Sequence, residues 1–300
     1  YWKDKDDYLS RCGGGPKMSI WKAFGGILFA NKTVCAGFLI FTLFGNSAQS
    51  FGQSLNLNSG KSGAPLEISA TNGVEWQQEK KVFVARGNAK AVRGTLTLRA
   101  RELAALYREQ PGGNTEVYLL QASGDVRLTS PGQTVTGQKG IYDVDNAILT
   151  ISGGKQVKFK TATDEITATK QLEYWEQRQL AVARGNAVAI REGRRLRADT
   201  LAAYFRKDKK GRSAVYRVEA FDNVHIKTAL DTVSADRGVY NVASGIATLT
   251  GTVQIIRGRN RLNGCRAEVN LNTGISKLFS CPQTRGTKRV RGVLQPIKKK

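Results

Sequence analysis

The sequence predicts an all-β protein with an internal 98-residue duplication, and two observations carry this prediction. The segments "VFVARGNAKAVR", from Val82, and "LAVARGNAVAIR", from Leu180, are nearly the same and start 98 residues apart. Along both segments apolar and polar residues alternate between turn-like positions, which is typical of strands and not of helices. The chain has 300 residues, of which 40% are hydrophobic, so it can bury a core.

The match at this spacing continues without a gap, which indicates a duplicated unit. The segment "LRARELAALYR" from Leu98 aligns with "LRADTLAAYFR" from Leu196. Further along, "GIYDVDNAILTISG" from Gly140 aligns with "GVYNVASGIATLTG" from Gly238. The stretch from Leu98 could also be written as a helix, but its place in a strand-rich repeat favours a strand.

A shorter rhythm runs through each copy, in which an aromatic residue is followed eleven positions later by glycine. The pairs are Trp76 and Gly87, Tyr142 and Gly153, Tyr174 and Gly185, and Tyr240 and Gly251. Several glycines precede Asn or Asp, a combination that favours tight turns. We therefore expect short antiparallel strands joined by turns and stacked as rungs.

The ends of the chain read differently from the repeats. An apolar run from Val34 to Gly45 follows two lysines, which is typical of a secretory signal, although an uncleaved anchor over residues 24–45 is the alternative. The predicted organisation is an upstream extension at 1–17, a signal peptide at 18–50, a linker at 51–64, a strand domain at 65–284 with repeats at about 76–173 and 174–271, and a basic disordered tail at 285–300.

A formal net charge of +23 implies an anionic partner, namely a nucleic acid, a membrane surface or an acidic glycolipid. An exported chain would not meet nucleic acid, so we expect none as a partner. The only histidine, His225, alternates with apolar neighbours and is expected to face solvent on a strand. No nucleophile elbow, HExxH motif or phosphate-binding glycine loop is present. We expect no catalytic site, no metal and no cofactor.

Two cysteines fall within the predicted strand domain. Cys265 and Cys281 are equidistant from Thr273, in a segment that predicts a turn. Two strands folded about that turn would bring the cysteines together, so we expect a disulfide in an oxidising compartment. Two unpaired buried thiols remain the alternative.

The stretch from Pro65 to Glu109 resembles the start of the OstA/LptA family of periplasmic lipopolysaccharide-transport proteins. Its matching features are an extended "PLEI" strand, an apolar strand ending in Gly-Asn, and "GTLTLRA". The likeness resumes in "GIYDVDNAILTISG". The resemblance implies an elongated V-shaped β-jelly-roll, the β-taco, that carries lipopolysaccharide with its acyl chains in an apolar groove. It also implies a periplasmic location, bridging of inner- and outer-membrane components through edge strands, and end-to-end self-association.

Alternation predicts which residues would face the lipid. They are Leu66, Ile68, Val82, Val84, Leu96, Leu98, Val126, Leu128, Tyr142 and Val144. The alternative is that these side chains only fill the core, as they would in any β-roll. Three other functions stay open: a membrane-anchored inner-membrane partner of the same fold, a periplasmic β-helix enzyme acting on acidic polysaccharide, and a basic nucleic-acid binder.

Overall fold

The computed structural model describes residues 66–207, 213–273, 275–281 and 290–293. The chain divides into two compact units, Tyr1–Ala48 and Gln49–Lys300, and all described residues belong to the second. The predicted upstream extension, signal peptide and linker lie outside the described residues, as does most of the predicted tail.

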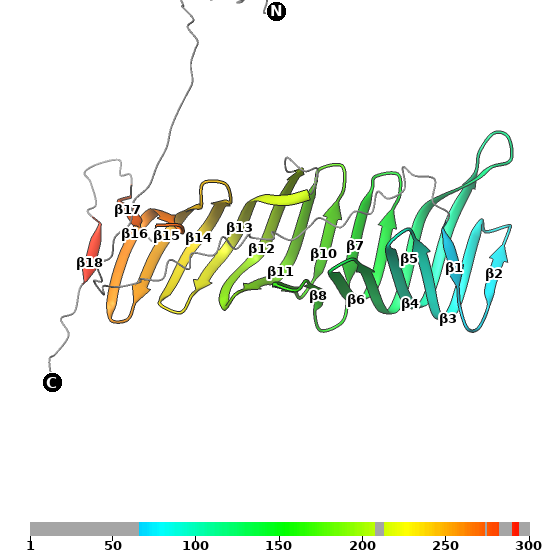
Figure 1. The fold of residues 1–300 in the computed structure, drawn as a ribbon, viewed down its shortest axis with the longest axis horizontal. Coiled ribbons are helices and arrows are strands. Elements are labelled where there is room, and N and C mark those ends of the chain that lie inside the picture. The colour runs from blue at the N-terminus through cyan, green and yellow to red at the C-terminus, as the bar shows by residue number, and fades with distance from the viewer. Residues whose placement is uncertain (1–65, 208–212, 274, 282–289, 294–300) are drawn as a thin grey trace, which may run out of the picture. The chain divides into compact units, whose positions relative to one another are not determined.

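The described residues form one antiparallel sheet of 18 strands (Figure 1). The strands are β1 Glu67–Ser69, β2 Val74–Gln77, β3 Val82–Arg93, β4 Leu96–Glu109, β5 Thr115–Ser130, β6 Gln133–Asp143, β7 Ile148–Ser152, β8 Val157–Lys160, β9 Asp164–Ala168, β10 Gln171–Trp175, β11 Leu180–Arg191, β12 Arg194–Lys207, β13 Ser213–Lys227, β14 Asp231–Asn241, β15 Ile246–Arg257, β16 Asn260–Asn270, β17 Ser276–Phe279 and β18 Arg291–Val293. The predicted all-β class is confirmed, and the segment from Leu98 that could have been a helix lies in β4.

The long strands bend in the middle, where the ladder shifts register. In β3 the pairing with β4 is interrupted between Arg86 and Ala89. The two residues between them, Gly87 and Asn88, have φ angles of 77° and 45°. Left-handed φ is where glycine and, less often, asparagine are tolerated. The prediction that Gly-Asn steps are turns between short strands is therefore wrong, because these steps bend single long strands.

The bends divide the sheet into two arms. Arm A contains the short strands β2, β7, β10 and β17 and the halves of the long strands that continue the same ladder. Arm B contains the short strands β1, β8, β9 and β18 and the other halves of the long strands. β3 shows the division, since residues 82–85 pair with β2 and residues 90–92 pair with β1. Each long strand thus contributes one half to each arm.

One hydrophobic cluster joins the two arms. It contains Ala85 and Leu103 from arm A together with Ala91 and Leu128 from arm B. Residues on opposite halves of bent strands can share a cluster only if the arms face each other across it. This arrangement agrees with the V-shaped jelly-roll that the resemblance implies.

The last strand lies in a segment that we predicted to be disordered. β18 pairs with residues 261–263 of β16, whereas β17 pairs with residues 266–269. β17 covers only the arm A half of β16, so the backbone groups of the arm B half are left to pair with another strand. β18 is that strand.

Candidate functional site

Apolar side chains fill the interior between the arms. Ala198 of β12 and Val224 of β13 lie next to the bend, and each is 1% exposed. Two residues farther out on the same strands, Leu196 and Ile226 are only partly buried against the cluster, whereas Leu128, which aligns with Ile226, is 2% exposed. The interior is therefore closed next to the bends, and in the second copy it is more accessible at these two outer positions.

The two copies of the repeat line this interior with many of the same residues. Eleven positions of the buried cluster and its packed neighbours are identical after 98 residues. They are Ile68 and Ile166, Ala70 and Ala168, Ala85 and Ala183, Ala89 and Ala187, Ala91 and Ala189, Leu98 and Leu196, Ala100 and Ala198, Leu103 and Leu201, Ala122 and Ala220, Val126 and Val224, and Val135 and Val233. Both copies thus contribute equivalent lengths of one apolar lining.

Seven of the ten residues predicted to face a lipid lie at this interior. Val126 and Leu128 belong to the buried cluster. The five that pack against it are Leu66, Ile68, Leu96, Leu98 and Tyr142. These residues come from β1, β4, β5 and β6 and from the residue before β1, so the fold gathers them from across the first copy.

The other three predicted residues are not part of the interior cluster. Val84 is buried, but it neighbours Ala85, which is in the cluster, and successive residues on a strand point to opposite faces. Val82 shares the face of Val84, and Val144 follows the end of β6. Val82 and Val84 lie on the face opposite to Ala85, Ala89 and Ala91, which are the residues that β3 contributes to the cluster.

Sequence reasoning also missed part of the lining. Among the missed residues are Phe159, Ile166, Leu172, Leu196, Ile226 and Leu262, which all pack against the cluster. The duplication itself carried the signal for three of them, since Ile166, Leu196 and Ile226 align with Ile68, Leu98 and Leu128.

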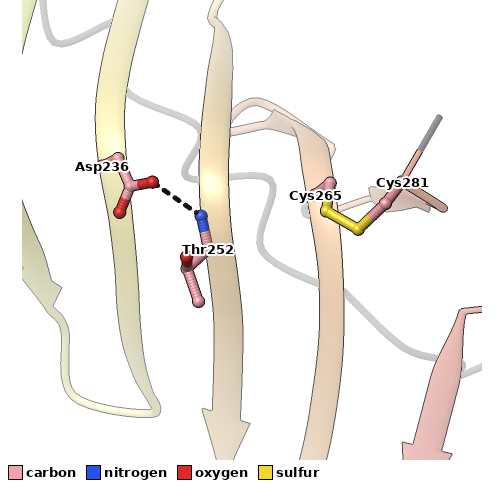
Figure 2. The surroundings of a disulfide bond; sticks show 4 residues. All are labelled: Asp236, Thr252, Cys265 and Cys281. Atoms are coloured by element: carbon pink, nitrogen blue, oxygen red, sulfur yellow. Dashed lines mark hydrogen bonds between the residues drawn. A yellow bond between two sulfur atoms is a disulfide. The ribbon is translucent and has the colours of Figure 1, made fainter. Parts of the chain in front are cut away.

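A disulfide closes the far end of the described sheet. Cys265 of β16 and Cys281, just after β17, are joined with their Cα atoms 4.9 Å apart (Figure 2). On the neighbouring strands, the backbone N–H of Thr252 donates to Oδ2 of Asp236 at 3.0 Å. This contact lies at the bend of β15, where Gly251 has a φ of 96° and leaves no room for a Cβ beside Asp236.

Charged side chains on the outer face of arm A are largely paired. Nη1 of Arg86 lies 2.6 Å from Glu75, and its Nε lies 3.0 Å from Glu102. In the second copy, Nε of Arg184 lies 2.6 Å from Glu173. Burial alone would raise the pKa of Glu173, but hydrogen bonds from Arg184, Gln171 and Trp175 outweigh it and hold the pKa below its ordinary 4.5.

One carboxyl group lies inside the apolar lining. Glu176, which follows β10, is 4% exposed, and burial raises its pKa to about 7. The Tyr142 hydroxyl and the positive charge of Arg93 act in the opposite direction. Burial also raises the pKa of Tyr142 to about 12, so at neutral pH its hydroxyl keeps its proton.

The described residues contain no group of three or more His, Cys, Asp or Glu side chains that could hold a metal ion. In the same part of the chain there is no helix that could cross a lipid bilayer. The single histidine, His225, lies exposed on β13. The antiparallel sheet, bent into two arms around one apolar cluster, defines the class of V-shaped β-jelly-roll proteins.

The family follows from comparison with known proteins. The sequence model of the family described as "LptA/(LptD N-terminal domain) LPS transport protein" matches residues 67–179 and again residues 165–275. These matches cover more than half of the chain, and the chain belongs to this family of lipopolysaccharide-transport proteins. Because the same family model matches the chain twice, the matches support the duplication independently of the repeated segments seen in the sequence.

Two individual proteins are similar to the chain. An uncharacterised protein of Rhizobium meliloti (strain 1021) is 30% identical over 97 residues, which are 31% of this chain and 52% of that protein. The chain thus spans about half the length of this curated relative. The crystal structure of LptH, the LptA-homologous periplasmic component of the lipopolysaccharide transport device of Pseudomonas aeruginosa, aligns over 78% of this chain and 97% of that one. The identity is 11% and the TM-score is 0.21, which is too low to support further argument.

Proposed function

We propose that the protein is a periplasmic carrier that binds lipopolysaccharide and shields its acyl chains between arm A and arm B. One observation carries the proposal: both copies of the repeat present the same apolar residues to the interior between the arms at eleven aligned positions. Each acyl CH₂ removed from water contributes about 0.8 kcal/mol. The five predicted residues that are only partly buried against the cluster are, in this proposal, contacts of the acyl chains: Leu66, Ile68, Leu96, Leu98 and Tyr142. Val126 and Leu128 fill the closed part of the interior.

We also propose that the ends of the sheet connect the carrier to its neighbours. In the part of the chain that is described, β2 pairs only with β3, and β17 pairs only with β16. Such open edges can accept a strand from a partner. The partners would be inner- and outer-membrane components of lipopolysaccharide export, and further copies of this chain stacked end to end.

The acyl-chain proposal is tested with two photocrosslinking variants of the purified protein. A photoreactive amino acid replaces Leu98, which packs against the interior cluster, or Thr97, its half-buried neighbour on β4. Because neighbouring side chains point to opposite faces, we expect crosslinks to lipopolysaccharide from position 98 and not from position 97.

Deacylated lipopolysaccharide serves as the competitor. It should not reduce crosslinking from position 98, because it offers the sugar and phosphate groups without the acyl chains. Equal crosslinking from both positions, or full competition by the deacylated form, would count against a groove that holds acyl chains.

A further inference from the structure

Three basic residues form a row on the outer face of arm B in the first copy. The ladder sets Lys90 opposite Arg99, and Arg99 opposite Arg127. Their sequence neighbours Ala89 and Leu98 face the interior, so the three basic side chains point to the other side of the sheet. We call Lys90, Arg99 and Arg127 the basic row.

The basic row is not neutralised by acidic neighbours. Within the described residues, ion pairs join Arg86, Arg108 and Arg184 of arm A to carboxylates, but none involves a member of the basic row. Side chains directly opposite in an antiparallel ladder lie about 5 Å apart, and like charges at that distance destabilise the sheet. Three cations in register are thus an unfavourable arrangement unless an anion lies over them.

An open pocket adjoins one end of the row. Its volume is about 290 Å³, and it is lined by Asp125, Val126, Arg127, Thr136, Gly137, Gln138, Gly153, Gly154, Lys155 and Gln156. Asp125, the one acidic residue of the lining, is paired with Arg101 at 3.3 Å. Arg127 and Lys155 add positive charge at the wall. Beyond the pocket, Thr136 lies opposite Arg127, and Lys158 lies opposite Thr136. Lys158 is paired with Glu165 at 3.1 Å, so in this described part of the sheet the unpaired basic side chains end at Arg127 and Lys155.

We propose that the basic row and this pocket bind the phosphate-bearing headgroups of an anionic lipid bilayer. The cations lie in a line across neighbouring strands and do not converge on one point, which suits a surface that offers many phosphates more than a single small anion. A ligand enclosed between the arms lies on the opposite side of the sheet, so its headgroup would not cover this face. The inference therefore does not depend on what the groove carries.

The basic row is tested by sedimentation of the protein with lipid vesicles. One set of vesicles mixes phosphatidylglycerol with phosphatidylcholine, and the other contains phosphatidylcholine alone. The test variant is Lys90→Gln/Arg99→Gln/Arg127→Gln. The matched control, Lys80→Gln/Arg259→Gln/Lys277→Gln, removes the same charge at exposed positions outside the row.

We expect the test variant to bind anionic vesicles about tenfold or more weakly than the unsubstituted protein, because each cation near such a surface strengthens binding several-fold. The control variant should lose less than about threefold by the same reasoning, since its charges are not held against the membrane. Both variants should keep the circular dichroism of a folded sheet, because all six side chains project from the sheet or its turns.

Three results would overturn the proposal. Equal losses in the two variants would reduce the effect to net charge. Equal binding of the unsubstituted protein to vesicles without phosphatidylglycerol would remove the requirement for anionic headgroups. Displacement from anionic vesicles by low concentrations of inorganic pyrophosphate would point to a site for a small anion instead.

Discussion

The two copies of the repeat agree on their inner faces and differ on their outer faces. Val126 and Val224, which are aligned in the two copies, are each 1% exposed at the interior. One residue later, the outward-facing pair is Arg127 and His225. An interior position is restricted by close packing on all sides, whereas an outward position meets solvent and can change at little cost. The copies therefore share an apolar interior and present different surfaces.

The bends belong to the shared part. The N–H of Thr71 donates to the carbonyl of Gly87 at 2.8 Å, and the N–H of Thr169 donates to that of Gly185 at the same distance. In each case the threonine hydroxyl also donates to the carbonyl that its own N–H contacts. The segment that precedes each copy thus holds the first bend of both copies with the same hydrogen bonds.

The largest expected effect comes from placing a charge at the equivalent interior positions. Val126→Asp and Val224→Asp should each lower the free energy of unfolding by about 4 kcal/mol or more, because a buried carboxylate without a partner is strongly unfavourable. Thr136→Asp and Ser234→Asp are the matched controls on the outer face and should change stability little. Denaturant titration measures all four, and a large difference between the two valine variants would break the equivalence of the copies.

The disulfide is the clearest structural difference between the copies. Cys265 aligns with Thr167 of the first copy, and Cys281, which lies beyond the second copy, follows Ala183 by 98 residues, so the first copy has no equivalent bond. Cys265→Ala/Cys281→Ala should lower the stability of the C-terminal end by about 3 kcal/mol, the value expected for a loop of this length. Hydrogen exchange should speed up in β16 and β17 and not in β9 and β11. Uniform or absent changes would show that the bond does not act locally.

Glu176 is a second difference, because the aligned residue one copy earlier is Gln78. Its pKa is raised from 4.5 to about 7, so the folded protein holds this proton more tightly than the unfolded chain. Stability should therefore be highest below about pH 4.5 and should fall by about 3 kcal/mol as the pH rises to about 7. Glu176→Gln should remove this decline and stabilise the protein at pH 8. If its unfolding free energy keeps the same pH profile, another group is responsible.

The sequence predicted the class and the duplication but not the bends. The alternation of apolar and polar residues in β4 is a local signal, and the repeat of the Val82 segment at Leu180 is visible directly in the sequence. Both gave correct predictions. A Gly-Asn step reports only that the backbone takes a left-handed conformation. Whether it closes a hairpin or bends one strand depends on pairing with distant segments, which local sequence does not contain.

The bends also decide how far alternation predicts which side chains reach the interior. In β4 the interior positions pass from Leu98 and Ala100 to Leu103, so alternation holds only within one half of that strand. In β5 the same alternation runs through the bend to Val126 and Leu128. Local sequence does not distinguish these two cases, because the register on each side of a bend depends on the neighbouring strands.

The smallest expected effect is present in the first copy and absent from the second, and it tests the outer face directly. Arg99 has Lys90 and Arg127 as its ladder neighbours, so Arg99→Gln should relieve repulsion and raise the free energy of unfolding by about 0.5 kcal/mol. The aligned Arg197→Gln should give no gain, since that residue lies between Val188 and His225 and donates to Asn186 at 3.0 Å. High salt should abolish the gain in the first copy, because the repulsion is between exposed charges. Denaturant titration at low and high salt measures both variants, and a gain of equal size in each would mean that the cross-strand charges do not distinguish the copies.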